Sequence, residues 1–301
     1  MIVREKPDAW DLLTVLHGSI VPRIILPVAF LAVVAVLVVV LDHWFGVVPR
    51  LDGSAYAVFG IGLSLFLGFR NNAAYDRWWE ARKLWGGLLA DTRTLAREAA
   101  LFLPDEAARH RLLRLTRAFL HLHRAQLRKI ASDPVAEAMT AAVPAASFAH
   151  TRHPPCAALS EMNLLLAQAH AAGKLDGFGA MTLSNRVAAL SLAQAGCERI
   201  VVTPLPYVYS LLVFRTSWLY VLLLPLALIE PAGWLTPLFT GIVAYTFFGL
   251  AEVTEELAHP FGPTANALPL AAICRAAEIS LAPHLNEPAP EPLQPHDFRL
   301  D

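Results

Sequence analysis

Four stretches of this sequence are long, apolar and almost free of charged residues. They cover residues 24–41, 53–69, 201–229 and 231–251, and Arg215 is the one charged residue within them. A helix needs about 20 predominantly apolar residues to cross the hydrocarbon core of a bilayer. A segment inside lipid must satisfy its own backbone polar groups, and a helix does so. We therefore expect an all-α membrane protein with four transmembrane helices per subunit.

The composition supports a membrane protein and argues against other classes. Only 16% of the 301 residues are charged, whereas a soluble domain carries about 25%. The net charge of −1 gives no reason to expect nucleic acid as a partner. Charged residues are frequent among the first 17 residues, before any apolar run, so we expect no cleavable signal peptide.

Basic residues beside the apolar stretches indicate the orientation. Arg50 is the only basic residue between the first two stretches. The opposite ends of these two stretches carry several, namely Arg4, Lys6, Arg23, Arg70, Arg77, Arg82 and Lys83. We expect a multi-pass protein of the inner (plasma) membrane with both termini in the cytoplasm.

The chain then divides into five regions. They are a cytosolic amino-terminal segment (1–22), the first two transmembrane helices (23–69), a large cytosolic helical region (70–200), the third and fourth transmembrane helices (201–251), and a cytosolic exit with an extended tail (252–301).

The second transmembrane helix is expected to continue far beyond the bilayer. Only the Gly86-Gly87 pair weakens the helical pattern before Pro104, which predicts about 50 residues and a length of about 75 Å. Asp105 is a plausible N-cap for the next helix, and further helices are expected over about 157–172 and 178–199.

The helix after Asp105 has a basic face. Its arginines lie outside the apolar stripe, at Arg111, Arg114, Arg117, Arg124 and Arg128. Such a face could line a route for anions, although a solvated helix face is the commoner explanation for this pattern.

The second apolar stretch contains two rows of residues with a period of four, which places each row on one helix face. One row is large and apolar and the neighbouring row is small: Ile61, Leu65 and Phe69, and Gly60, Ser64 and Gly68. Small residues let helices pack closely in lipid, and apolar rings around an axis can gate by dewetting. Pattern alone fits equally a face that contacts lipid or another helix.

Other polar residues suggest little chemistry. Glu252 and Glu256 share a helix face at the end of the last stretch. They could attract ions, but ordinary surface carboxylates fit as well. Arg215 should face the protein interior or water, because a charge in lipid is costly. No phosphate loop, nucleophile elbow or metalloprotease motif is present, so we expect no catalysis, cofactor or metal site.

The residues from Phe69 to Gly86 form the most specific motif in the chain. They read Phe-Arg-Asn-Asn-Ala-Ala-Tyr-Asp-Arg-Trp-Trp-Glu-Ala-Arg-Lys-Leu-Trp-Gly, and their most distinctive members are Arg70, Asn71, Asn72, Arg77 and Trp78. This motif resembles the signature of the bestrophin family of ion channels, as found in bacterial members. Shorter similarities occur in the same order at Met1-Ile2-Val3-Arg4, His17-Gly18-Ser19, Thr203-Pro204-Leu205-Pro206 and His259-Pro260-Phe261-Gly262.

The resemblance implies a homopentamer with one central pore. It implies a neck of three apolar rings at Ile61, Leu65 and Phe69, and a second, cytosolic constriction near Phe178 and Gly179. It also implies that the Pro-rich tail after Pro283 lies across a neighbouring subunit.

Two departures from the family pattern concern animal members. Leu65 stands where these carry an aromatic ring, and no acidic run follows Pro260-Phe261-Gly262, so the calcium clasp of animal members is not expected. We expect a channel that passes monovalent ions passively, with chloride-like anions favoured. A sodium- or potassium-selective channel that uses Glu252 or Glu256 is the alternative, and a membrane enzyme or scaffold is an alternative of another class.

Overall fold

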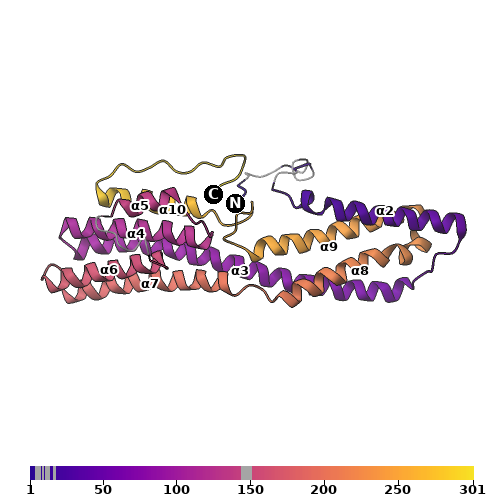
Figure 1. The fold of residues 1–301 in the computed structure, drawn as a ribbon, viewed down its shortest axis with the longest axis horizontal. Helices are drawn as coiled ribbons and strands as arrows, with labels where there is room; N and C mark the ends of the chain where they lie inside the picture. Colours follow the sequence, from indigo (N-terminus) through magenta and orange to yellow (C-terminus); the bar gives the residue numbers. More distant parts are fainter. Residues whose placement is uncertain (4–7, 9, 11–13, 16–17, 144–150) are drawn as a thin grey trace. The chain divides into compact units, whose positions relative to one another are not determined.

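The computed structural model describes residues 1–3, 8, 10, 14–15, 18–143 and 151–301. Two positions of the amino-terminal similarity, Arg4 and His17, lie outside these described residues. The named elements of the described chain are all helices (Figure 1), as predicted. They form two compact units, which we describe separately.

The first unit, called the apolar unit, contains Glu5–Trp78 and Pro204–His259. Its helices are α2 (Val21–Phe45), the first part of α3 (Gly53–Phe102), α8 (Tyr207–Ala232) and α9 (Thr236–Ala258), with the short 3₁₀ helix η2 (Gly233–Leu235) between the last two.

Three segments are long and apolar enough to cross a membrane, and they are Val21–Phe45, Gly53–Phe102 and Tyr207–Ala258. The third segment contains both α8 and α9, which pack against each other (Figure 1). Gly233, with a φ of +49°, lies at the predicted reversal between them, in a backbone conformation that glycine tolerates best.

The third apolar helix starts later than predicted. The sequence suggested residue 201, whereas α7 continues to Val202 and α8 begins at Tyr207. Pro204 and Pro206 explain the gap, because proline lacks the N–H that a continuing helix needs.

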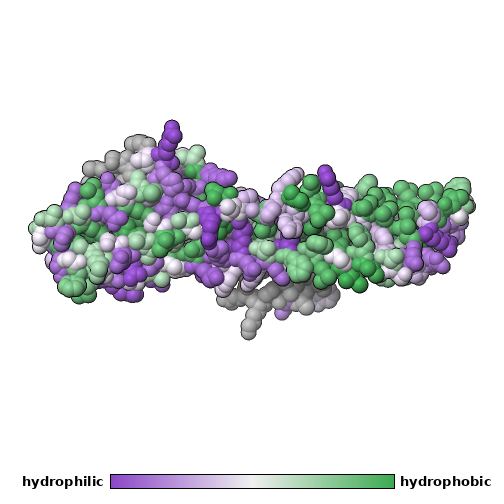
Figure 2. Space-filling view, turned by 90° about the horizontal axis from the view of Figure 1, so that it is seen from below, coloured by the Kyte–Doolittle hydropathy of each residue, from purple (hydrophilic) through white to green (hydrophobic). Residues whose placement is uncertain are grey.

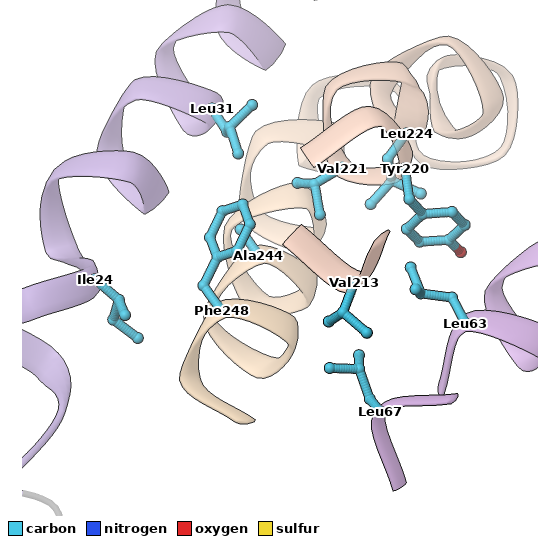
Figure 3. Close-up of a cluster of buried hydrophobic side chains, with 10 residues drawn as sticks. All are labelled: Ile24, Leu31, Leu63, Leu67, Val213, Tyr220, Val221, Leu224, Ala244 and Phe248. Carbon is cyan, nitrogen blue, oxygen red and sulfur yellow. The ribbon is translucent and has the colours of Figure 1, made fainter. Parts of the chain in front are cut away.

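The core of the apolar unit joins all four of its helices (Figure 3). Its ten buried members are Ile24 and Leu31 of α2, Leu63 and Leu67 of α3, Val213, Tyr220, Val221 and Leu224 of α8, and Ala244 and Phe248 of α9. In lipid, close packing of these side chains, and not their removal from water, holds the four helices together. Hydrophobic residues also cover much of the outer surface of this unit (Figure 2), as expected for helices that face lipid.

Gly60 allows α3 to approach α8 closely. A Cβ atom at this position would lie 2.4 Å from Oη of Tyr220. The Tyr220 ring has little freedom to move, since it stacks on Tyr56 at 4.5 Å and meets Phe247 edge-on at 5.4 Å. Gly60 therefore packs within its own chain.

The second unit, called the charge-rich unit, contains Met1–Arg4, Trp79–Thr203 and Pro260–Asp301. Its helices are the remainder of α3, α4 (Glu106–Leu127), α5 (Pro134–Ala141), α6 (Pro154–Ala171), α7 (Gly177–Val202), α10 (Leu270–Leu281) and the 3₁₀ helix η3 (Ala282–Leu285).

The predicted helices of this unit are present with small shifts. The α3 helix has 50 residues, as expected, and Asp105 caps α4 by accepting hydrogen bonds from the backbone N–H groups of Ala107 and Ala108. The α6 helix begins at Pro154, earlier than predicted, because prolines in a first helical turn lose no hydrogen bond.

The basic face of α4 is neither a free anion route nor a purely solvated face. Each of its five arginines lies beside a carboxylate of the same unit: Arg111 by Glu161, Arg114 and Arg117 by Glu287, Arg124 by Asp133, and Arg128 by Asp301. The face therefore holds α5, α6 and the carboxyl-terminal tail against α4.

Both ends of the Pro-rich tail contact their own chain. Glu287 lies 2.7 Å from Arg117, and the backbone N–H of Leu300 donates to the carbonyl of Met1 at 2.9 Å. Most residues between these anchors, from Glu291 to Arg299, are exposed. Contact of this exposed stretch with a neighbouring subunit stays a prediction.

His123 of α4 is fully buried between aromatic rings. It stacks on Trp85 at 5.6 Å and on Phe119 at 5.8 Å, and neither ring nitrogen has a hydrogen-bond partner among the described residues. Burial lowers the pKa of His123 to about 3, and nearby His153 adds a smaller effect.

The first prediction concerns acid stability. Folding lowers the pKa of His123 from its ordinary value of about 6.5. Below about pH 6.5 the unfolded chain therefore binds a proton at this residue, whereas the folded chain does not. Stability is then lost progressively as the pH falls from there toward 3, by about 2 kcal/mol at pH 5. His123→Phe should shrink the fall in melting temperature between pH 7.5 and pH 5 in detergent.

The matched control is His296→Gln, because the side chain of His296 is 94% exposed. This variant should keep the wild-type fall. An undiminished fall in a folded His123→Phe protein would contradict the prediction.

The second prediction compares two glycines of α3. Gly60→Ala should destabilise the protein by about 1–3 kcal/mol, since the added methyl group overlaps Tyr220. Gly62→Ala meets nothing within 4 Å and should be neutral or stabilising by up to about 1 kcal/mol, because alanine favours a helix. Thermal unfolding of the two purified variants tests the difference, and equal melting temperatures would refute it.

Candidate functional site

The predicted neck residues form an exposed apolar face on α3. Ile61, Leu65 and Phe69 are 62%, 57% and 69% exposed, although their side chains are large and hydrophobic. Leu63 and Leu67, two residues away, point to the opposite side and are buried against the core (Figure 3). Val58, Phe59 and Phe66 of α3 are exposed as well, so the uncovered apolar surface of the protomer includes the three predicted positions and is broader than that row.

The row of small residues has more than one role. Gly60 packs on Tyr220 of the same chain, and Ser64 donates a hydrogen bond to the carbonyl of Ile61 at 2.8 Å. A Cβ at Gly68 would meet nothing within 4 Å. Packing of this row between copies stays a prediction, and Gly68 is its clearest candidate.

The signature residues attach α3 to the end of α9. Nη2 of Arg70 lies 3.0 Å from both Oγ of Ser210 and a carboxylate oxygen of Glu255. Nε of Arg77 donates to the carbonyl of Ala258 at 2.7 Å. Arg70 follows Phe69 directly, so these contacts fix the end of the exposed apolar face.

The other signature residues are less engaged in this attachment. Asn71 accepts a long hydrogen bond of 3.4 Å from Thr254 of α9, and Asn72 is exposed. The Trp78 ring lies beside Tyr75 of the same helix, with ring centroids 6.5 Å apart. The sequence identified this motif, but not its partners, because the partners come from a distant part of the chain.

The two carboxylates suggested as ion-attracting are paired. Nη1 of Arg23 lies 2.5 Å from Glu252 and 3.0 Å from Glu256, and Glu256 is buried. Arg23 is at the start of α2 and the glutamates are near the end of α9, so the cluster joins two helices. Glu256 is thus not a surface carboxylate, Glu252 is a partly exposed one, and attraction of ions by either stays a prediction.

Phe178 and Gly179 lie at the start of α7, in the charge-rich unit. Phe178 is 76% exposed. Gly179 is buried, since a Cβ there would approach Leu175 and Phe102 to within 3 Å. Their role at a constriction stays a prediction, for which the exposed Phe178 is the better candidate.

Arg215 lies outside the core of its own protomer, and whether it faces water or a neighbouring copy stays a prediction. It is exposed on α8, on the side opposite the buried residues Val213 and Ser217. No ion pair or hydrogen bond joins its side chain to the described part of the protein. The arginine therefore lies on the protomer surface at membrane depth and not in the protomer core.

No metal centre accompanies these residues. Among the described positions, no group of three or more histidine, cysteine, aspartate or glutamate side chains is placed to hold a metal ion. The features with a possible function are thus the uncovered face of α3, its attachment to α9, and Arg215.

Comparison with known proteins gives concordant results. A family described as "Bacterial/Fungal Bestrophin protein" matches residues 1–283. A voltage-dependent anion channel-forming protein of Mesorhizobium japonicum is 43% identical over 299 residues, which cover 99% of this chain and 96% of that protein. A protein of Escherichia coli with the same description is 36% identical over 287 residues, 93% of each chain.

The fold agrees with solved structures. The crystal structure of a bacterial bestrophin homologue from Klebsiella pneumoniae matches with a TM-score of 0.80 and 31% identity, and the match covers 88% of this chain and 99% of that one. A second membrane protein crystal structure matches with a TM-score of 0.82 and 32% identity. This all-helical, multi-pass membrane protein belongs to the bacterial and fungal bestrophin family.

Proposed function

We propose that the protein is a passive anion channel whose pore is lined by the uncovered face of α3. The observation that carries this proposal is the exposure of Ile61, Leu65 and Phe69 on one side of a membrane-length helix. The relatives described as voltage-dependent anion channel-forming proteins support it from an independent direction.

The channel is a closed ring of identical subunits, and a homopentamer is the assembly we propose. A ring turns the α3 face of every copy toward a common axis. Arg215 supports assembly as well, since a charge at membrane depth normally faces protein or water. In the separate protomer it is exposed and has no partner among the described residues, and a neighbouring copy would cover it.

We place α2, the first part of α3, α8 and α9 across the inner membrane as four spans. The α8 and α9 helices have 26 and 23 residues, so each is long enough to cross alone. From the basic residues beside the spans we infer a cytoplasmic position for the charge-rich unit and both termini.

The neck controls the passage of ions by how readily water enters it. Rings of Ile61, Leu65 and Phe69 offer no hydrogen bonds to a hydrated ion, so water enters a narrow neck only at a cost in free energy. Aromatic rings have positive edges, and those of Phe69 can face a partly dehydrated anion favourably. Carboxylates, which would favour cations, are absent from the apolar run of α3 between Gly53 and Phe69.

The relatives described as anion channel-forming proteins favour anion conduction over the cation alternative. Glu252 and Glu256 share the single guanidinium group of Arg23, so their carboxylates outnumber the positive charge and do not decide between the two. Family membership likewise favours a channel over a membrane enzyme or scaffold.

The third prediction tests the neck. Replacing Ile61, Leu65 and Phe69 together by alanine should widen and wet the constriction, and anion flux from liposomes should rise several-fold. Leu63 is the matched control, since it is buried on the opposite side of α3 and Leu63→Val should leave flux unchanged. A triple variant that assembles normally and conducts like the wild type would place the constriction elsewhere.

The fourth prediction tests selectivity. In a planar bilayer with a potassium chloride gradient, the reversal potential should lie near the equilibrium potential of chloride. Glu252→Gln should leave it unchanged, because Glu252 is paired with Arg23. A reversal potential near that of potassium would establish the cation alternative, and the absence of any current would favour an enzyme or scaffold.

A further inference from the structure

A cavity of about 530 Å³ opens on the apolar unit between α2, α8 and α9. This volume falls within the range of about 300–1,000 Å³ that is typical of ligand pockets. The cavity shares no lining residue with the proposed neck face, so ion conduction does not explain it.

The wall of the cavity has two chemically different parts. Ile24, Phe214, Trp218 and Phe248 supply an apolar part. Four charged residues supply the other part, and they are Arg23, Arg70, Glu252 and Glu255.

All four charged residues lie at the helix ends for which we propose the cytoplasmic side of the membrane. Arg23 is near the start of α2, Arg70 follows the apolar run of α3, and Glu252 and Glu255 are near the end of α9. With these helices across a bilayer, the charged part lies at headgroup level and the apolar part lies among the acyl chains.

Several polar atoms of the cavity wall lack a partner within the protein. Oγ of Ser217, a residue only 1% exposed, and Nε of Arg70 make no hydrogen bond to the described residues. Pro27 inside α2 has no N–H to donate to the carbonyl of Arg23, so this carbonyl loses its helical partner. Both side-chain atoms are buried behind the surface of the cavity wall, so a ligand is recognised by the charges at the cavity mouth and not by these atoms.

The charges of the cavity mouth match a zwitterion. Arg23 and Arg70 already contact Glu252, Glu256 and Glu255, so a phosphate would share their N–H donors with these carboxylates. Glu252 and Glu255 in turn offer acceptors that suit a primary ammonium group. Glu256, which also contacts Arg23, leaves the cluster with one more carboxylate than guanidinium groups, so a purely anionic headgroup is disfavoured.

We propose that this cavity is a binding site for a zwitterionic phospholipid with a primary amine, namely phosphatidylethanolamine. The phosphate lies by Arg23 and Arg70, the ammonium group lies by Glu252 and Glu255, and one acyl chain follows Trp218 and Phe248. The site requires only that the apolar unit lie in a bilayer, and it is independent of which ions the channel passes.

Native mass spectrometry of the purified full-length protein tests this site. The detergent-solubilised protein is titrated with phosphatidylethanolamine or with phosphatidylglycerol of the same acyl chains. The ethanolamine lipid should be retained about tenfold more strongly, which corresponds to about 1.4 kcal/mol, since its ammonium group donates hydrogen bonds to the carboxylates. Phosphatidylcholine, which keeps the positive charge but has no N–H, should be retained more weakly than phosphatidylethanolamine.

Two substitutions of Ser217 separate the effect of filling the cavity from the effect of losing the Ser217 hydroxyl. Ser217→Phe places a ring in the cavity and should reduce retention of phosphatidylethanolamine to the level of phosphatidylglycerol. Ser217→Ala keeps the volume open and should retain the preference. Both variants should elute as the same oligomer as the wild type.

A second measurement covers the case in which Ser217→Phe does not fold. Phosphatidylethanolamine with brominated acyl chains should quench the fluorescence of the wild-type protein, and Trp218→Phe should remove a large share of that quenching. Equal retention of the two headgroups, or quenching unchanged by Trp218→Phe, would overturn the proposal.

Discussion

The contacts of Arg70 determine how α3 presents its two apolar faces. One face carries Leu63 and Leu67 into the core, and the other carries the neck residues. Arg70, directly after Phe69, is held at 3.0 Å by Ser210 of α8 and Glu255 of α9. Hydrogen bonds to charged groups contribute about 1.5–3 kcal/mol, and more is lost when a buried charge loses its partner. The direction of the exposed side chains of Ile61, Leu65 and Phe69 therefore depends in part on an ion pair at the end of their helix face.

Much of this architecture could be predicted from local sequence patterns. The apolar lengths predicted the membrane helices, and the absence of breakers between Gly53 and Pro104 predicted one 50-residue helix. The period of four at Ile61, Leu65 and Phe69 predicted a shared face, which the structure shows to be uncovered. These features succeed because backbone hydrogen bonding and side-chain spacing are local properties.

The features that sequence reasoning missed depend on partners far apart in the chain. Nothing near Glu252 in the sequence indicates that Arg23 neutralises it, and nothing near Gly60 indicates Tyr220. The basic face of α4 also seemed available for ions, yet Glu287, 170 residues from Arg117, pairs with it. Pairing of this kind follows from tertiary packing, and a single sequence carries no direct signal for it.

The close contact of Gly60 with Tyr220 limits how the proposed neck could open. If α3 rotated about its own axis by one residue, about 100°, the side chain of Ile61 would have to enter the space that only a glycine now permits. Tyr56 and Phe247 hold the Tyr220 ring in place, so the ring cannot swing aside cheaply. A helix-twisting gate is therefore sterically opposed. Any widening has to come from tilting α3 together with α8, or from rotamer changes of the neck side chains themselves.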